Sequence, residues 1–214
     1  MEQRRYQREG TGLSFDRVAF FTDAVFAIAL TLIVVGIGVP AVADRDSGKA
    51  LFDALVDQRA ELISFFVGVA VIGFYWMSHH WSYDALEAVD TGFVWWTVVY
   101  LAFVAFLPFP IRLVGTYDEN PVAWCFLALN LAFVSGMETM LLAHSQGAGL
   151  RKEQATPERA RWERWMSLSP VPVFIVSGAL AFVWPWLTLI VWATTPFVQA
   201  GLTRLFPPSV TADG

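Results

Sequence analysis

The residues with the most evident chemistry stand inside or beside long apolar runs. Asp23 lies in the first run, residues 18–39, six positions after Arg17. A charged side chain at the middle of a membrane helix costs about 2.5–3.5 kcal/mol on insertion scales, so it normally has a partner or lines water. His79 and His80 close the next apolar run. Carboxylates and imidazoles inside a membrane serve as proton relays, and as hydrogen-bonding groups they also hold helices together.

The partner of Asp23 is expected on another helix. Six residues rotate an ideal helix by about 600°, so the side chains of Asp23 and Arg17 point away from each other. Candidate partners gather at the same end of the following two apolar runs: Trp76, His79, His80, Asp84 and Asp90. Such a network either braces the helices near the membrane surface or supports a functional helix beside it. The residues alone leave both interpretations open.

The sequence contains no motif that indicates a metal site, a cofactor site or an enzyme active site. His79 and His80 are adjacent, so on a helix they point to different sides and do not chelate one ion together. The sequence also lacks a glycine-rich phosphate loop, HExxH, GxSxG and a pair of cysteines with metal spacing. We therefore predict no metal, no cofactor and no enzymatic activity. Cys125 is the single cysteine, which excludes an intrachain disulfide.

Composition indicates which elements must position these residues. Of the 214 residues, 56% are hydrophobic and 15% are charged, and the mean hydropathy is +0.52. Such a chain is more apolar than a water-soluble domain, and a membrane helix needs roughly 20 apolar residues. We predict an all-α, multi-pass protein of the cell membrane, embedded in the lipid bilayer, with one transmembrane domain over residues 1–214. Its six spans cover about residues 18–39, 61–81, 92–111, 122–143, 168–183 and 186–205.

The polar segments between the spans indicate the orientation. With the N-terminus inside, ten of the 14 lysines and arginines fall on the cytoplasmic side, as the positive-inside rule requires. An even number of spans then places both termini in the cytoplasm. Residues 144–167 form a basic cytoplasmic linker, in which Thr156-Pro157 predicts an N-cap followed by proline at the first helical position. The net charge of −5 argues against a nucleic-acid partner.

A cleaved signal peptide is the rival interpretation of the first apolar run. Ala41-Val42-Ala43 resembles the small-x-small pattern of a cleavage site, and basic residues precede the run. A signal core is usually about 7–15 residues long, whereas this run is longer and contains Asp23. We therefore expect the first helix to be retained.

Deeper in the first run lies a narrow apolar stripe. Ile28, Leu32 and Val35 fall at i, i+4 and i+7, with Thr31 on the flank. On periodicity alone such a stripe faces lipid or a neighbouring helix. The TVGYG-like carbonyl filter of common potassium channels is missing from the sequence, as is an arginine-repeat voltage sensor.

Several short motifs resemble one family. The run Arg17-x3-Phe21-Thr22-Asp23 resembles the RxxxFSD signature on the first helix of the transmembrane protein 175 potassium channels, here their six-helix prokaryotic branch. The likeness continues at residues 25–32, at Tyr75-Trp76-x2-His79-His80 and at Leu107-Pro108-Phe109-Pro110. It covers the first half of the chain, and the later spans match in number and layout. Thr22 replaces the family serine, which keeps the hydroxyl and adds a methyl group.

This resemblance implies a homotetramer whose first helices surround a central potassium-selective pore. By position it assigns Ile28, Leu32 and Val35 to successive rings of aliphatic side chains that gate the pore. Thr31 becomes the polar position that contacts a passing potassium ion. The motif and its supporting network comprise Arg17, Phe21, Thr22, Asp23, Trp76, His79, His80 and Asp90. Val35 is smaller than the leucine expected in the third ring.

Two other functions are compatible with the residues. A proton-coupled carrier would exchange protons through Asp23 and His79 or His80. Against it, the spans lack the paired glycine- or proline-interrupted helices that mark many carrier sites. A membrane scaffold without transport activity is the third possibility.

Overall fold

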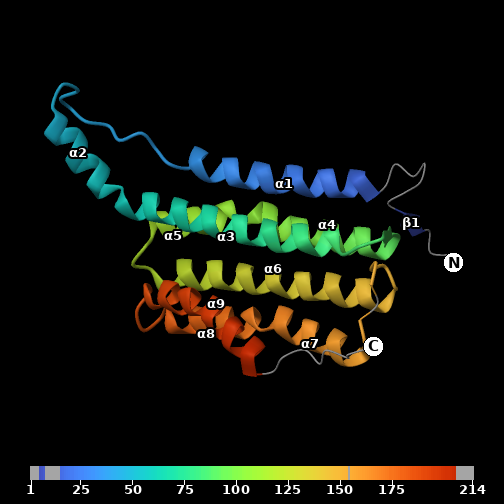
Figure 1. Ribbon diagram of the computed structural model, residues 1–214. Helices are drawn as coiled ribbons and strands as arrows, with labels where there is room; N and C mark the ends of the chain where they lie inside the picture. Colours follow the sequence, from blue (N-terminus) through green and yellow to red (C-terminus); the bar gives the residue numbers. More distant parts are fainter. Residues whose placement is uncertain (1–4, 8–14, 154, 206–214) are drawn as a thin grey trace.

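The chain folds as a bundle of helices. The computed structural model describes residues 5–7, 15–153 and 155–205. The elements are β1 (Arg5–Gln7), α1 (Phe15–Val35), α2 (Gly48–Asp57), α3 (Arg59–Asp84), β2 (Ala88–Asp90), α4 (Thr91–Phe106), α5 (Pro108–Thr116), α6 (Pro121–Gly147), α7 (Pro157–Leu168), α8 (Pro170–Leu180) and α9 (Leu187–Leu205). Figure 1 shows α2 at one end of the bundle and the antiparallel pair β1 and β2 at the other.

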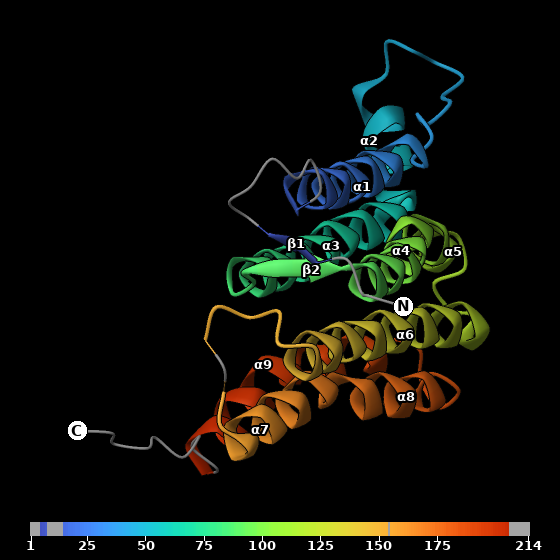
Figure 2. The same ribbon diagram turned by 90° about the vertical axis from the view of Figure 1, so that its right-hand side faces the viewer.

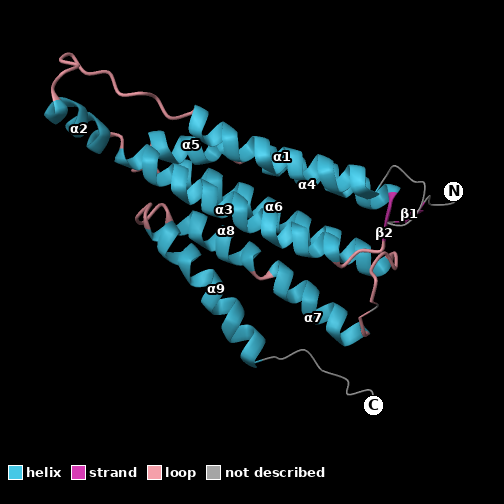
Figure 3. Cartoon of the chain, turned by 45° about the horizontal axis from the view of Figure 1, so that its top comes forward, coloured by secondary structure: helices cyan, strands magenta, loops and turns pink. Residues whose placement is uncertain are grey.

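The helices form layers that follow the order of the chain. Figure 2 shows α1 on one side of a layer made by α3, α4 and α5, and α6 on the other side. Helices α7, α8 and α9 lie beyond α6, and α8 packs against it. In Figure 3 the long helices run in a common direction, whereas α9 is inclined to them. Among the described elements, the helices that pack on α1 therefore all lie on one side of it.

Four helical segments are long and apolar enough to cross a membrane. Within the described residues they are Phe15–Val35, Arg59–Asp84, Thr91–Thr116 and Pro121–Gly147. The third comprises α4 and α5, which meet at Leu107 just before Pro108, where a missing amide hydrogen interrupts the helix. These segments correspond to the first four predicted spans.

Several boundaries differ from the predicted ones, and local chemistry explains them. Helix α1 ends at Val35 rather than at residue 39, because Gly36, Gly38 and Pro40 follow. The polar segment between the first two predicted spans holds the ten-residue helix α2. The N-cap predicted at Thr156 is confirmed, since its side chain accepts a hydrogen bond from the backbone amide of Arg159.

The predicted fifth and sixth spans fall on α8 and α9. Helix α8 has 11 residues, which gives it a length of about 16 Å, whereas a bilayer core is about 30 Å thick. Helix α7, within the predicted linker, precedes α8 and is separated from it by Ser169 alone. Six membrane crossings and cytoplasmic termini therefore stay predictions.

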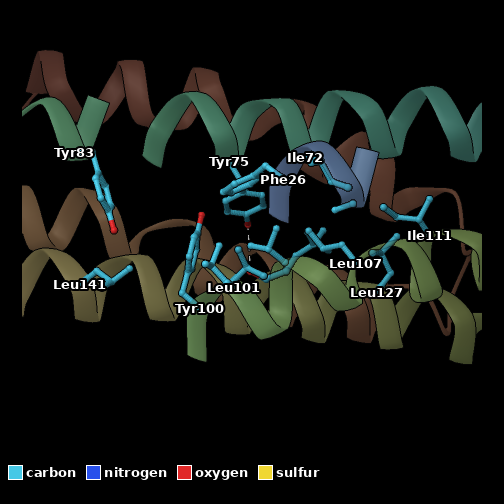
Figure 4. Packing of buried hydrophobic residues seen from close by; sticks show 14 of the residues in the cluster. Phe26, Ile72, Tyr75, Tyr83, Tyr100, Leu101, Leu107, Ile111, Leu127 and Leu141 are labelled. Atoms are coloured by element: carbon cyan, nitrogen blue, oxygen red, sulfur yellow. Dashed lines mark hydrogen bonds between the residues drawn. The ribbon is translucent and has the colours of Figure 1, made fainter. Parts of the chain in front are cut away.

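The core lies between α1, α3, α4 and α6 and is rich in aromatic side chains. Figure 4 shows Phe26 of α1 beside Ile72 and Tyr75 of α3. The Tyr75 hydroxyl reaches across to α6, where it lies 2.7 Å from the hydroxyl oxygen of Ser135. Large side chains thus bridge α3 and α6 and fix the layer on which α1 packs.

Candidate functional site

Helix α1 has one buried face and one exposed face. Thr22, Phe26, Ala29 and Ile33, spaced three or four residues apart, are buried against the bundle. The predicted gate residues occupy the other side: Ile28 is 57% exposed, Leu32 48% and Val35 76%. A continuous stripe of large aliphatic side chains is therefore about half or more exposed among the described residues of one protomer.

Thr31 lies on the same exposed side. Its hydroxyl donates a hydrogen bond to the backbone carbonyl of Ile28, at 2.8 Å. This bond uses the only hydroxyl hydrogen, so the oxygen keeps lone pairs that face outward. Thr31 can therefore present an acceptor to a cation beside the aliphatic stripe.

The partner of Asp23 is Trp76. The indole Nε1–H of Trp76 on α3 donates to Oδ1 of Asp23 at 2.9 Å. The same indole stacks on His80 one turn later, with ring centroids 5.6 Å apart and an interplanar angle of 25°. Nε2 of His80 lies 3.6 Å from Oδ2 of Asp84. The polar network predicted around Asp23 thus links α1 to the outer face of α3.

His79 belongs to a different environment from His80. Its side chain is buried, and its ring lies 5.0 Å from the ring of Tyr100 at an interplanar angle of 12°. Phe26 of α1 is 6.0 Å away and Tyr83 is 4.5 Å away, both measured between ring centroids. The two histidines point to different sides of α3, as predicted, and only His80 lies next to Trp76.

Asp90 lies apart from Asp23. It ends β2 and forms the N-cap of α4, where Oδ1 accepts from the backbone amide of Phe93 at 2.7 Å. The same oxygen lies 2.8 Å from Nε2 of His144 at the end of α6. Gly92 makes room for this imidazole, because a Cβ at that position would lie 2.8 Å from Cε1 of His144. Asp90 therefore joins α4 to α6 and does not touch the network around Asp23.

The remaining motif residues lie at the start of α1. The Thr22 hydroxyl donates to the carbonyl of Val18 at 2.9 Å, so the hydroxyl predicted to matter at this position bonds within its own helix. Phe21 is 54% exposed and Arg17 is exposed. In the ranges that the structure describes, Arg17 makes no ion pair.

Two candidate functional residues, His144 and Glu138, were not predicted from the sequence. His144 was assigned to the start of the linker, and its pairing with Asp90 depends on contacts between distant segments. Glu138 lies inside the predicted fourth span, and its Oε1 is buried. The signal for Glu138 was present, because the cost of a charge inside a membrane helix applies to it as it does to Asp23. Over the described residues no group of three His, Cys, Asp or Glu side chains is placed to hold a metal ion.

Comparison with known proteins identifies one family. The sequence profile described as "Endosomal/lysosomal potassium channel TMEM175" matches residues 17–108. A potassium channel of Chamaesiphon minutus is 31% identical over 125 residues, which are 55% of this chain and 61% of the relative. A potassium channel of Streptomyces collinus is 36% identical over 101 residues, 47% of this chain and 48% of the relative. The matched regions thus span about half to three fifths of these relatives.

A solved structure extends the comparison to most of the chain. The crystal structure of a lysosomal potassium-selective channel TMEM175 homolog from Chamaesiphon minutus superposes with a TM-score of 0.73. The superposition covers 87% of this chain and 96% of that chain, at 24% sequence identity. At this identity the likeness establishes the fold. It includes much of the region after residue 108, where the family profile ends.

Proposed function

Since this chain belongs to the TMEM175 family, in its prokaryotic branch, we propose that it is a potassium-selective channel of the cell membrane with a pore lined by α1. The family profile and the relatives are named as ion channels, which indicates a function other than catalysis. One structural observation carries the assignment of the pore. The stripe of Ile28, Leu32 and Val35 is exposed although the opposite face of the same helix is buried.

We propose a homotetramer in which four copies of this stripe surround the central axis. In a membrane, a row of exposed large aliphatic side chains is covered either by lipid or by other copies of the chain. Rings of aliphatic side chains narrow enough to exclude water form a dewetting gate, and a modest widening lets water and a cation enter. The ring of Ile28 would be the first of three barriers, followed by those of Leu32 and Val35.

Thr31 supports selectivity for potassium in this arrangement. Aliphatic rings cannot replace the water around an ion, so discrimination depends on how readily each cation loses part of its hydration shell. Potassium is less costly to dehydrate than sodium. The Thr31 oxygen, with its hydrogen bonded to Ile28, offers a ring of acceptors at the point where water is stripped.

The network around Asp23 holds α1, the helix that carries the proposed gate, against α3. The bond from Trp76 to Asp23 attaches the start of α1 to α3, one to three turns before the gate residues. Its role in the proposal is to hold the angle of α1, which determines the width of each ring. Asp23 and Trp76 need not touch the ion.

Orientation and the number of spans complete the proposal. The charge distribution favours the β2 end in the cytoplasm, with the basic segment 144–167 on that side and both termini inside. Helices α8 and α9 would form the fifth and sixth spans of the tetramer. The end of the bundle that carries α2 then faces outward.

Liposomes loaded with potassium test the proposed activity. Purified protein is reconstituted, and potassium efflux is measured with and without a proton gradient. We expect passive efflux that does not saturate and that exceeds sodium efflux under the same gradient. Strict dependence on a proton gradient would instead support a carrier that uses Asp23 with His79 or His80. Asp23 is bonded to Trp76, which stacks on His80, whereas His79 stacks on Tyr100. No efflux in either condition would favour a scaffold.

A further inference from the structure

Two buried polar atoms, one on α3 and one on α6, have no hydrogen-bond partner among the described residues, and the residues that carry them line the same cavity. They are Nε2 of His79 on α3 and Oε1 of Glu138 on α6. We call this cavity the polar slot. It is lined by His79, Ser82, Tyr83, Leu86, Phe93, Glu138, Leu141, Leu142, Ser145 and Arg151. Figure 4 shows two of its walls, Tyr83 reaching down from α3 and Leu141 on α6.

Ser78 on α3 makes a side-chain hydrogen bond with the carboxyl group of Glu138, but Oε1 of Glu138 and Nε2 of His79 have no partner among the described residues. Two further hydroxyls beside the slot, those of Ser82 and Ser145, do not supply a donor. Ser82 donates its hydrogen to the carbonyl of Ser78 at 3.0 Å, and Ser145 donates to the carbonyl of Leu142 at 2.9 Å. Each hydroxyl has one hydrogen, so both are used within their own helices. Leaving a buried acceptor without a donor is costly, most of all for a carboxylate.

The slot has the size and the polarity that a water molecule requires. Its volume is about 20 Å³, whereas a buried water needs roughly 10–15 Å³ and two to four polar partners. Water carries two hydrogens, so it can donate to Oε1 of Glu138 and also to Nε2 of His79 when the imidazole hydrogen is on Nδ1. Empty cavities in proteins are typically apolar, and this one has a carboxylate and an imidazole on its walls.

We propose that the polar slot binds one water molecule, which donates one hydrogen to Oε1 of Glu138 and the other to Nε2 of His79. The imidazole is then neutral, with its hydrogen on Nδ1. The water adds a link between α3 and α6 to the direct contacts that already join these helices, namely that of Tyr75 with Ser135 and that of Ser78 with Glu138. It explains how a carboxylate is accommodated inside a helix that is apolar enough to span a membrane.

A bare alkali cation fits the slot less well. A cation that enters such a site must exchange its hydration shell for several oxygen ligands. The slot offers one free carboxylate oxygen and the oxygens of Ser82 and Ser145, but its lining also includes the guanidinium of Arg151, whose positive charge repels a cation. A single water satisfies the two free acceptors without further ligands.

The water also bears on the pore helix, a consequence that rests on the proposed function. His79 contacts Phe26, which is buried on the face of α1 opposite the gate stripe. Holding the imidazole through the water therefore holds the surface on which α1 packs. Glu138 acts in this respect as a positioning residue, through His79 and Phe26.

A structure of the full chain in lipid nanodiscs at about 2 Å resolution tests the site directly. We expect a solvent peak at hydrogen-bond distance, about 2.7–3.2 Å, from both Oε1 of Glu138 and Nε2 of His79. An empty slot, a direct bond between the two residues, or a guanidinium nitrogen of Arg151 in place of the water would overturn the proposal. An anomalous peak at the site after exchange into rubidium would also overturn it, in favour of a cation.

Variants test the same site in solution. Glu138→Leu removes the acceptor and fills the slot, so it should lower the Tm by roughly 2–8 °C and reduce potassium efflux. Glu138→Gln keeps an acceptor oxygen and should retain the water, the Tm and the efflux. Ser82→Ala is the matched control, since it lines the slot while its hydroxyl bonds elsewhere. Equal Tm values for all three variants would refute the bridge.

These experiments distinguish a failure of the proposed water site from a failure of the proposed channel function. If no protein, wild type included, conducts potassium, the proposed function fails, while the solvent peak and the Tm differences still decide the site. If Glu138→Leu does not assemble, the structure of Glu138→Gln decides: the water persists under our proposal, and its loss contradicts it.

Discussion

Replacing Trp76 by phenylalanine removes the indole N–H donor together with one ring of a side chain that packs against the core. The indole Nε1–H donates to a carboxylate oxygen of Asp23 at 2.9 Å. A phenyl ring keeps an aromatic surface for the stacking on His80, now 5.6 Å between centroids. Hydrogen bonds to charged groups contribute about 1.5–3 kcal/mol. Because Asp23 is exposed, we expect a contribution at or below the lower limit of this range, about 1–1.5 kcal/mol. For a chain of this size that loss lowers the Tm by about 2–6 °C.

Thermal unfolding of the purified oligomer measures this effect, and the same helix offers a control. Trp81 is also on α3, is 66% exposed and has no hydrogen bond from its indole to a described residue. Trp81→Phe should therefore leave the Tm unchanged. Equal shifts for the two variants would refute the assignment of a bond between α1 and α3 at Trp76.

A double-mutant cycle sharpens the same test. In Asp23→Asn the amide oxygen can still accept from the indole, so the Tm should fall less than in Trp76→Phe. Once Asn stands at position 23, adding Trp76→Phe should cost less than it does in the wild type, because a neutral acceptor makes the weaker bond. Additive effects would mean that the two side chains do not interact.

Two further predictions concern other contacts of the bundle. In Gly36→Ala the new Cβ would lie 2.8 Å from Cδ of Arg112. Displacing that side chain from the end of α1 should lower the Tm by about 2–4 °C. Gly38→Ala is the control, because a Cβ at position 38 has nothing within 4 Å, and its Tm should equal that of the wild type. Asp90→Ala removes both the N-cap of α4 and the partner of His144. Asp90→Asn keeps an acceptor oxygen, so the Tm should fall more in Asp90→Ala than in Asp90→Asn. Equal Tm values for these two variants would contradict the roles assigned to Asp90.

The sequence was informative where one residue in an apolar run required an explanation. The cost of Asp23 predicted a partner on another helix, and Trp76 was among the candidates. Its selection over His79, His80 or Asp84 depends on how α3 is rotated against α1. Helix α3 is apolar on all sides within the membrane segment, so its sequence carries no signal of which side faces α1.

Contacts between distant segments could not be predicted either, because the sequence does not show how the helices are rotated and placed against one another. Asp90 stands near Asp23 in the predicted topology, yet its place at the end of β2 makes it the cap of α4 and brings it to His144. That contact depends on the length of α6, which continues to Gly147, beyond the predicted end of the span. Glu138 differs, since the rule applied to Asp23 would have identified it.

Helix boundaries followed local chemistry where strong breakers occur. Proline and glycine mark the ends of α1 and the junction of α4 and α5. The last two predicted spans are less well specified, because short apolar stretches are divided by Pro170 and Pro185. With 11 residues α8 is shorter than a bilayer core, so its apolar sequence does not by itself decide whether it crosses the membrane.

The claim that α1 lines a pore through Ile28 is tested most directly by comparing two isoleucines of equal exposure. Ile28 on α1 is 57% exposed and Ile190 on α9 is 54% exposed. Each is replaced by asparagine, and potassium and sodium currents are recorded from the reconstituted protein. Our account predicts that Ile28→Asn makes the ring easier to wet and so raises the current or lowers the preference for potassium, while Ile190→Asn changes neither. Wild-type currents in Ile28→Asn would show that Ile28 does not face the pore.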